Sequence, residues 1–374
     1  MHNNPPLSGS RRVAGRTPSP IILWLALFCG LLGGVASAAD LHPATKSLLA
    51  GLKSPILLHG NDRIAYRDPL LFYQGDTFHL FFSYVREEED RLIYWYVATS
   101  ESKDLVHWTE PRTLTPKGQD LNYASPGNIV RVGDQWLMGV QTYPIVNFRR
   151  GDPLRFNDDR ARLFLLHSRD FVTWSNPELI KVKGPDVGEA ELGRMIDPFL
   201  LRDKDVPGKW WCFWKQAGSI HCSWSYDLRT WTVGTRTIAF GENAQVIVVD
   251  GEYVMFYAPA NGVGVKRSSD LVHWREEEPP IVLGQKDWPW CETRLTGGYV
   301  ADLRDVPGVG KYVMVCHSMG PGKKRTDANV NANCHILIAW SDDLKTWEWP
   351  GKQATSAAPA FCRKDSRFGL RRRV

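Results

Sequence analysis

The chain has 374 residues, of which 43% are hydrophobic and 23% are charged, and its formal net charge is +5. This composition is that of a globular protein, and the length fits two domains or one large β domain. The charge is close to balanced and no basic face stands out, which argues against a nucleic-acid-binding protein.

The N-terminal segment has the features of an export signal. Three arginines precede the apolar run IILWLALFCGLLGGVASA at 21–38, and the run ends in the small residues Ala-Ser-Ala. Such an order is typical of a signal peptide with its cleavage site. We predict a signal peptide over 1–38, a mature chain of net charge +2 from Ala39, and no stable membrane span after cleavage. The expected location is periplasmic or extracellular.

Six of the seven cysteines lie after the predicted cleavage site. Cys212 and Cys222 flank a predicted turn, and Cys316 and Cys334 flank a longer loop, so each pair could form a disulfide in an oxidising compartment. Buried thiols fit the pattern equally well. No Cys or His spacing is typical of a zinc site.

Short β-strands follow one another along the chain in repeating units. In the first unit, apolar and aromatic strands at 69–73, 76–85 and 92–100 surround the turn Gly75-Asp76 and a charged hairpin. The fourth unit has the same order, with the turn Asp250-Gly251 between apolar runs. A glycine-containing dipeptide between apolar runs is a strong hairpin signal.

A seven-residue motif, Ser-x-Asp-(Leu/Phe)-x-x-Trp, closes each unit. Its five copies end at Trp108, Trp174, Trp231, Trp274 and Trp347. The Ser and Asp side chains are expected to accept backbone N–H bonds and close a turn. The Leu and Trp are expected to share one side of a tight helical turn, where the Trp packs against the neighbouring unit.

Five copies of one unit with unequal spacing predict an all-β fold, a five-bladed β-propeller of four-stranded antiparallel blades around a central pocket. The predicted propeller covers 39–350. Residues 351–374 form either a basic tail or a segment that closes the last blade. The stretch SPILLHG at 54–60 could instead supply the outer strand of that blade.

The entrances of the five innermost strands are expected to meet at the centre of the ring. Asp68 and Glu242 each lie eight residues before the aspartate of the following hairpin turn. The same count gives Asp197 in the third unit and Gly297 in the fifth. Three of five equivalent positions are therefore predicted to be carboxylates that converge from different blades.

These residues carry a resemblance to a known family. The propeller repeats, Asp68 in Arg-Asp-Pro, Asp197 in Ile-Asp-Pro and Glu242 in Gly-Glu-Asn resemble glycoside hydrolase family 43 and its relatives in families 62, 32, 68 and 117. The resemblance spans about 55–350. One departure is that Asn-Ala follows Glu242 where family 43 commonly has Gly-Pro, which bears on the subfamily and substrate.

The resemblance implies an exported glycosidase that acts with inversion, with arabinofuranosyl or xylosyl linkages favoured. Asp68 would be the general base that activates water, and Glu242 the general acid that protonates the leaving oxygen. Asp197 would hold Glu242 in place and supply the negative charge that keeps it protonated. The partner would be a carbohydrate substrate, and the sequence leaves the oligomeric state open.

Further residues near the strand entrances are candidates for binding sugar. Arg67 and Arg294 could bond hydroxyl or carboxylate groups, and the aromatic side chains could stack on a sugar ring. The aromatic candidates are Tyr66, Tyr123, Phe240, Trp288 and Trp290. Three acids are rivals to Glu242 but lie outside the repeat register, namely Glu189, Glu191 and Glu292.

Several alternatives stay open within this architecture. They are a retaining fructosidase like those of family 32, a neoagarobiose hydrolase-like enzyme with a His acid, a mannoside phosphorylase, and a sugar-binding propeller without catalysis. The phosphorylase would need a basic phosphate cluster that the sequence does not place. No cofactor is required, although Ca²⁺ could bind in the axial channel near His317 or His335.

Overall fold

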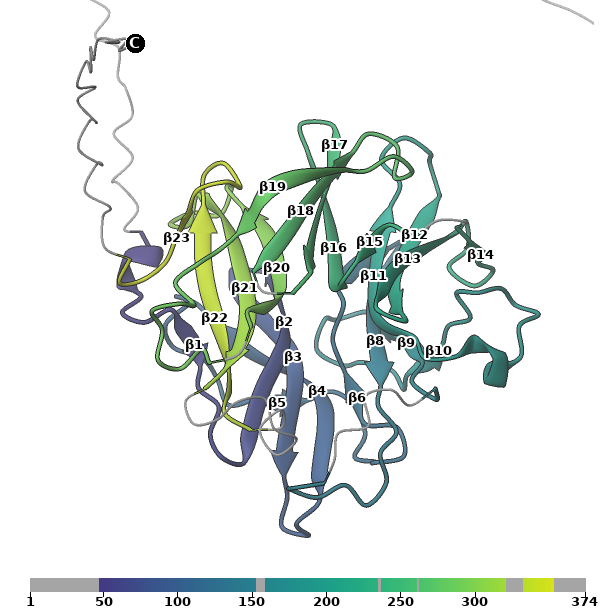
Figure 1. Cartoon of the computed structure of the whole chain (residues 1–374), viewed down its shortest axis with the longest axis horizontal. Helices are drawn as coiled ribbons and strands as arrows, with labels where there is room; N and C mark the ends of the chain where they lie inside the picture. The colour runs from purple at the N-terminus through teal and green to yellow at the C-terminus, as the bar shows by residue number, and fades with distance from the viewer. Residues whose placement is uncertain are drawn as a thin grey trace, which may run out of the picture. The chain divides into compact units, whose positions relative to one another are not determined.

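The computed structural model describes residues 47–152, 159–234, 237–260, 262–292, 294–320 and 332–352 (Figure 1). These residues form β-strands, loops and two short 3₁₀ turns, η1 (Leu49–Gly51) and η2 (Glu189–Leu192), with no α-helix among them. No helix in these ranges is long and apolar enough to cross a membrane. The predicted signal peptide and all but two residues of the predicted tail lie outside the described residues.

The largest sheet has nine strands in two antiparallel runs that meet at one parallel pair, Ala65 opposite Cys334. The first run is β2 (Ile64–Gln74), β3 (Thr77–Glu87), β4 (Ile93–Ser102) and β5 (Arg112–Thr113). The second run is β20 (Thr296–Leu303), β21 (Lys311–Met319) and β22 (Cys334–Ser341). Both β23 (Trp347–Glu348) and β1 (Ile56–Leu58) pair with β22, so SPILLHG does supply a strand to the last run.

Three more antiparallel sheets correspond to the second, third and fourth predicted units. The second contains β6 (Tyr123–Ala124), β7 (Ile129–Val132), β8 (Gln135–Thr142), β9 (Leu163–Ser168) and β10 (Glu178–Leu179). The third contains β11 (Ile196–Arg202), β12 (Trp210–Gln216), β13 (Ser219–Ser225), β14 (Thr232–Val233) and β15 (Ala239–Phe240). The fourth contains β16 (Glu242–Val249), β17 (Glu252–Ala258), β18 (Val263–Ser268) and β19 (Arg275–Ile281).

The hydrophobic core lies between successive strand sets. One buried cluster spans each junction, including the junction between the last set and the first. Members from the two sides of each junction are Phe81 and Val140, Leu163 and Trp214, Phe213 and Met255, Phe256 and Met314, and Val315 and Phe82. Strands buried on both faces explain the nearly continuous apolar and aromatic runs in the sequence.

The repeated motif forms a hydrogen-bonded turn, as the sequence predicts. In the fourth copy, Ser268 Oγ accepts the backbone N–H of Leu271 at 2.9 Å, and Asp270 Oδ1 accepts two backbone N–H groups. The predicted helical geometry is wrong, because the apolar residue has a left-handed backbone in every copy. These residues are Leu105, Phe171, Leu228, Leu271 and Leu344, with φ from 60° to 65°.

The motif tryptophans contact the preceding strand set, which confirms their predicted packing role. The ring centroid of Trp174 lies 6.2 Å from that of Phe81 on β3, and the centroid of Trp274 lies 6.4 Å from that of Phe213 on β12. The Trp274 indole also donates to the Leu271 carbonyl at 3.1 Å. Each turn therefore fixes one aromatic ring between two neighbouring sheets.

Replacing Ser268 by Ala is expected to lower the free energy of unfolding by about 1–3 kcal/mol, because the Leu271 N–H would lose its acceptor inside the protein. Ser268 and Leu271 are both buried. Val272 in the same turn is half exposed, so Val272→Ala is the matched control and should cost less than about 0.5 kcal/mol. Denaturant unfolding of both variants measures the difference, and equal losses would contradict the role of the hydroxyl.

Candidate active site

The five strand entrances share one backbone feature. In each set the pairing of the innermost strands is interrupted at a residue with positive φ. These residues are Asp68 (48°), Ser125 (45°), Asp197 (57°), Asn243 (53°) and Gly297 (69°). Asp, Asn and Gly are the residues that adopt this conformation most readily. A cavity of about 30 Å³ is lined by all five, so the entrances meet as the repeats predict.

This common feature corrects the register of the fourth unit. Asn243, and not Glu242, is the counterpart of Asp68 and Asp197. Glu242 pairs directly with Ala258 and precedes the irregularity, as Arg67 does in the first unit. The count of eight residues fails because the hairpin aspartates occupy different turn positions. Glu242 therefore enters the site from the neighbouring position on its strand.

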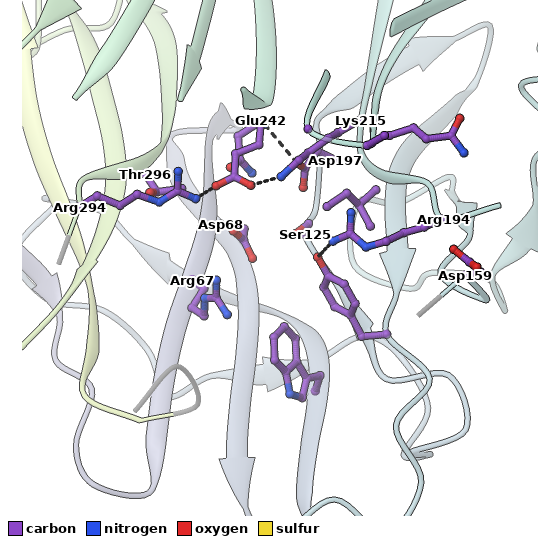
Figure 2. A pocket seen from close by; sticks show the side chains of 17 residues that line it. Arg67, Asp68, Ser125, Asp159, Arg194, Asp197, Lys215, Glu242, Arg294 and Thr296 are labelled. Carbon is purple, nitrogen blue, oxygen red and sulfur yellow. Dashed lines mark hydrogen bonds and ion pairs between the residues drawn. The ribbon is translucent and has the colours of Figure 1, made fainter. Parts of the chain in front are cut away.

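Glu242 nevertheless faces the same space as the two aspartates. A cavity of about 540 Å³ is lined by Asp68, Asp197 and Glu242, which come from β2, β11 and β16 (Figure 2). A volume of several hundred Å³ is typical of a small-molecule site. The structure thus brings together the three carboxylates that the sequence singles out.

Asp68 is held as a carboxylate by its neighbours. Burial pushes its pKa upward, but the nearby His317 and Arg67 and hydrogen bonds from Ser83 and Ser125 outweigh burial and keep the pKa below its usual value. The Ser83 hydroxyl donates to Asp68 Oδ2 at 2.8 Å. Burial lowers the pKa of His317 to about 3, and its Nδ1 accepts the Asp68 backbone N–H. The Arg67 guanidinium adds a positive charge that does not depend on pH.

The pKa of Asp197 shifts in the opposite direction from that of Asp68. Its side chain is buried, with 7% of the residue exposed, and burial raises its pKa above the usual value. The positive charge of Lys215 opposes this shift, whereas the negative charge of Asp68 adds to it. The Asp197 backbone N–H donates to Gln141 at 2.5 Å, and its carboxylate accepts the Asn243 backbone N–H at 3.2 Å.

Glu242 lies between two cations. One carboxylate oxygen pairs with Lys215 at the end of β12, and the other pairs with Arg294 in the segment before β20 (Figure 2). The side chains of Glu242 and Lys215 are each 15% exposed, and that of Arg294 is 30% exposed. Opposite charges at this range favour the ionised carboxylate.

Two further arginines complete the lining. The Arg67 guanidinium lies over the Trp95 ring, 5.4 Å from its centroid. Arg194 bonds the Tyr143 hydroxyl at 3.5 Å, a long contact, and comes from the segment that leads into β11. Four cations and four acids, including Asp159, therefore line one cavity.

Comparison with known proteins supports one fold. No family model and no curated protein sequence matches the chain. A structure described as "Glycoside hydrolase" matches with TM-score 0.54 and 14% identity, over 78% of this chain and 93% of the other. The calcium-free xylotriose complex of the compost-metagenome family 43 β-xylosidase/α-arabinofuranosidase CoXyl43 matches with TM-score 0.52 and 11% identity, over 80% and 97%. A family 43 protein of the Bacteroides ovatus xyloglucan locus matches with TM-score 0.50 and 16% identity, over 78% and 55%.

The chain has the family 43 glycoside hydrolase fold. The resemblance that the sequence predicts is thereby confirmed for the fold.

Within this family 43 fold, four predicted sugar-binding aromatics lie away from the cavity. Tyr66 stacks on Tyr84 in the core, because strand alternation points it away from Arg67. Tyr123 is buried against Phe164. Neither residue lines the cavity, so the prediction that they lie where they can stack on a sugar there is wrong.

The tryptophans of WPWCETRLTGG form a packing cluster. Trp288 and Trp290 stack on each other with centroids 4.6 Å apart, and Trp288 contacts Trp349 edge to face. Both pack against a core cluster, and neither lines the cavity. They are therefore not a sugar platform in this cavity, whereas Arg67 and Arg294 do line it as predicted.

The rival acids do not reach the cavity. Glu189 and Glu191 lie in η2, where the Glu191 side chain accepts the Gly188 backbone N–H. Glu292 follows Cys291 and is absent from the lining, although Arg294 two residues later is part of it. Glu242 is the only glutamate among the described lining residues.

Sequence reasoning missed Arg194, Lys215, Tyr143 and Trp95. Of these four residues, only Lys215 has a signal in the sequence, because it directly precedes the predicted turn Gln216-Ala217-Gly218. In the structure Lys215 pairs with Ile196, next to Asp197. The direction of its side chain depends on that cross-strand register. Arg194, Tyr143 and Trp95 belong to no motif in the sequence.

No group of three or more His, Cys, Asp or Glu side chains suited to a metal ion occurs in the described ranges. His317 uses Nδ1 to accept the Asp68 N–H, and His335 bonds Gly60 and Gly320. These two histidines bond backbone groups and do not form a cation cage with other described side chains. The five described cysteines are buried free thiols, including Cys212 and Cys222.

Proposed function

We propose that this protein is a glycoside hydrolase that cleaves glycosidic bonds of poly- or oligosaccharides. The observation that carries the proposal is the convergence of Asp68, Asp197 and Glu242 on one cavity in a family 43 fold. Hydrolysis of a glycosidic bond requires an acid and a second carboxylate on opposite sides of the sugar. The charged and hydrogen-bonding groups around each of these carboxylates differ, so the three carboxylates can have different roles.

In the proposed reaction, Asp68 is the general base. Its ionised carboxylate takes a proton from water as the water oxygen attacks the anomeric carbon. The bond from that carbon to the leaving oxygen breaks, and Glu242 supplies the proton that the leaving oxygen needs. One proton is gained at Asp68 and one is lost at Glu242, and exchange with solvent resets both. The attack from the face opposite the leaving group gives inversion.

Asp197 is proposed as a positioning residue. It accepts the backbone N–H of Asn243, the residue that follows Glu242, and thereby fixes the start of β16. Burial raises its pKa and the negative charge of Asp68 adds to the shift, so it accepts a proton more readily than an ordinary aspartate. Asp68 and Glu242 are the groups that transfer protons in the reaction, since Asp68 takes one from water and Glu242 gives one to the leaving oxygen.

We propose that the five strand sets are the blades of a closed five-bladed propeller. Two observations support this arrangement, namely the buried cluster at each of five successive junctions and the contribution of all five entrances to one cavity. The pairing of β1 with β22 would tie the N-terminal side of the chain to the last blade. Closure of this kind removes exposed sheet edges.

For the finer function, we propose an exported enzyme that acts on xylosyl or arabinofuranosyl linkages. The N-terminal apolar run with its Ala-Ser-Ala end supports export, and the description of CoXyl43 as a xylosidase and arabinofuranosidase supports the sugar type. The test is release of sugar from aryl xylosides, aryl arabinofuranosides and plant polysaccharides, with proton NMR of the first-formed anomer. Saturable binding of these sugars without turnover would identify a sugar-binding propeller instead.

Phe240 is the aromatic residue that best fits a sugar platform. The residue is 81% exposed, and it lies on β15 opposite Ser219, two residues before Glu242 at the start of β16. Gly218, which precedes Ser219, lines the cavity. An exposed aromatic face at a rim offers stacking worth about 1 kcal/mol.

Phe240→Ala is therefore expected to raise KM about 3–10-fold with kcat changed less than about 2-fold, since stacking acts on the bound sugar in ground and transition state alike. Steady-state kinetics on the best substrate of the panel measure both constants. Phe240→Tyr keeps the ring and serves as the control. A loss confined to kcat would contradict a platform role.

A further inference from the structure

Four cations line the cavity beside its four acids. Arg67, Arg194, Lys215 and Arg294 enter it from four separate segments of the chain (Figure 2). Neutral sugars need hydroxyl-bonding groups and a stacking surface, and neither requires this density of positive charge. Guanidinium and ammonium groups are the side chains that bind carboxylates and other oxyanions.

The position of two of these cations conflicts with the chemistry proposed for Glu242. A general acid must carry a proton before it can donate one, yet Lys215 and Arg294 flank the carboxylate and favour its ionised form. Glu242 takes a proton more readily when one or both of these cations bind another anion. A neutral sugar hydroxyl competes poorly with a carboxylate for an ammonium or guanidinium group.

The other charged residues of the cavity also bear on which ligand it can bind. Lys215 and Arg194 also act electrostatically on Asp197, and Arg67 acts on Asp68. Burial raises the pKa of Asp197, so of the four acids that face the four cations this one accepts a proton more readily than an ordinary aspartate does. Lys215 and Arg294 are partly exposed and can therefore be reached by a ligand in the cavity.

We propose that the substrate is an acidic sugar chain whose anionic group, a uronate carboxylate or a sulfate ester, binds Lys215 and Arg294 beside Glu242. This inference rests on the proposed glycosidase function. Binding of the anion draws the two cations away from Glu242, which then takes a proton from solvent and becomes competent as the acid. The same oxyanion chemistry would suit free phosphate, so the experiment includes phosphate as a separate arm.

The first experiment compares matched aryl glycosides on the full-length protein. A β-glucuronide is a β-xyloside that carries a carboxylate on C5, and the β-glucoside is its neutral isostere. We expect kcat/KM for the 4-nitrophenyl glucuronide to exceed that for the glucoside by about 10–100-fold, the usual worth of a charge-assisted hydrogen bond. A 6-sulfated galactoside and its unsulfated form make the second pair. Every assay is run with and without inorganic phosphate.

Variants then connect the preference to the named cations. Lys215→Met and Arg294→Met are expected to lower the charged-to-neutral ratio about 10-fold or more, and Lys215→Arg is expected to restore most of it. The matched control is Lys266→Met. Lys266 also has a 15% exposed side chain and pairs across two strands with Glu276, but it lies away from the cavity. It should leave the ratio unchanged.

Each outcome bears on one proposal. Equal cleavage of charged and neutral glycosides would overturn the acidic-substrate inference and leave the glycosidase function standing. Cleavage of neutral glycosides that requires phosphate and yields a sugar phosphate would assign the cations to phosphate and also overturn it. If nothing is cleaved, the glycosidase proposal fails, and calorimetry with glucuronic acid and glucose decides the inference. Uronate-selective binding that Lys215→Met abolishes would uphold it, and equal or absent binding would overturn it.

Discussion

Asp68→Asn is expected to lower kcat about 10³-fold, within the usual range for removal of a general base, and to leave KM within a few-fold. The amide cannot accept the proton of the attacking water, but it has the size and shape of the carboxylate. It also retains an oxygen that can accept the Ser83 hydroxyl. The loss should be independent of the leaving group, because the base acts on water and not on the departing oxygen.

The pH dependence gives a second test of Asp68. Because its folded-state pKa lies below the usual value of 3.8, the carboxylate stays ionised until the pH falls below about 4. The acid limb of kcat/KM assigned to this group should therefore lie below pH 4 and disappear from the residual activity of Asp68→Asn. An unchanged kcat in Asp68→Asn, at an unchanged melting temperature, would remove Asp68 from the mechanism.

Much of the fold could be predicted because the motif that closes each unit is local. Ser268 and Asp270 specify their turn through bonds to neighbouring backbone groups, so the five copies are visible without tertiary information. The left-handed Leu271 could not be predicted, because the sequence reports the donors and acceptors of a turn but not the sign of φ at a residue that usually avoids positive values.

The candidate site was predictable where it lies in a repeat. Asp68 and Asp197 each precede a proline at an equivalent irregularity, and both have the same backbone conformation. The count that selects Glu242 is wrong by one residue, since Asp76 is the second residue of its hairpin loop and Asp250 is the first. Glu242 still reaches the cavity because it belongs to the same strand entrance.

Residues outside the repeats could not be placed from the sequence. Two neighbouring tryptophans such as Trp288 and Trp290 could form a sugar platform or part of the core. Only their stacking on each other and the contact of Trp288 with Trp349 show which one they form. Lys215 and Arg294 lie far apart in the chain and meet at Glu242 only in the folded protein. Cross-strand and loop geometry therefore decides the charge of the cavity.

Glu242→Gln is expected to show a loss of activity that depends on the leaving group. Glutamine cannot donate a proton, so kcat/KM for a polysaccharide or an alkyl glycoside should fall about 10³-fold. The 2,4-dinitrophenolate of a 2,4-dinitrophenyl glycoside departs without protonation, so kcat/KM for this substrate should fall less than about 10-fold. Kinetics on a series of aryl glycosides of decreasing leaving-group acidity measure this contrast, which Asp68→Asn should not reproduce.

Glu292→Gln is the matched control, because Glu292 is the rival acid nearest in sequence to the cavity residue Arg294 and does not line the cavity. It should retain wild-type activity on every member of the series. Glu242→Gln also removes the negative charge between Lys215 and Arg294, so its melting temperature must be compared with that of the wild type before the kinetics are interpreted. A uniform loss across all leaving groups in a folded Glu242→Gln variant would mean that Glu242 organises the two cations and that another group donates the proton. Asp197, whose pKa is raised by burial, would then be the acid to test next.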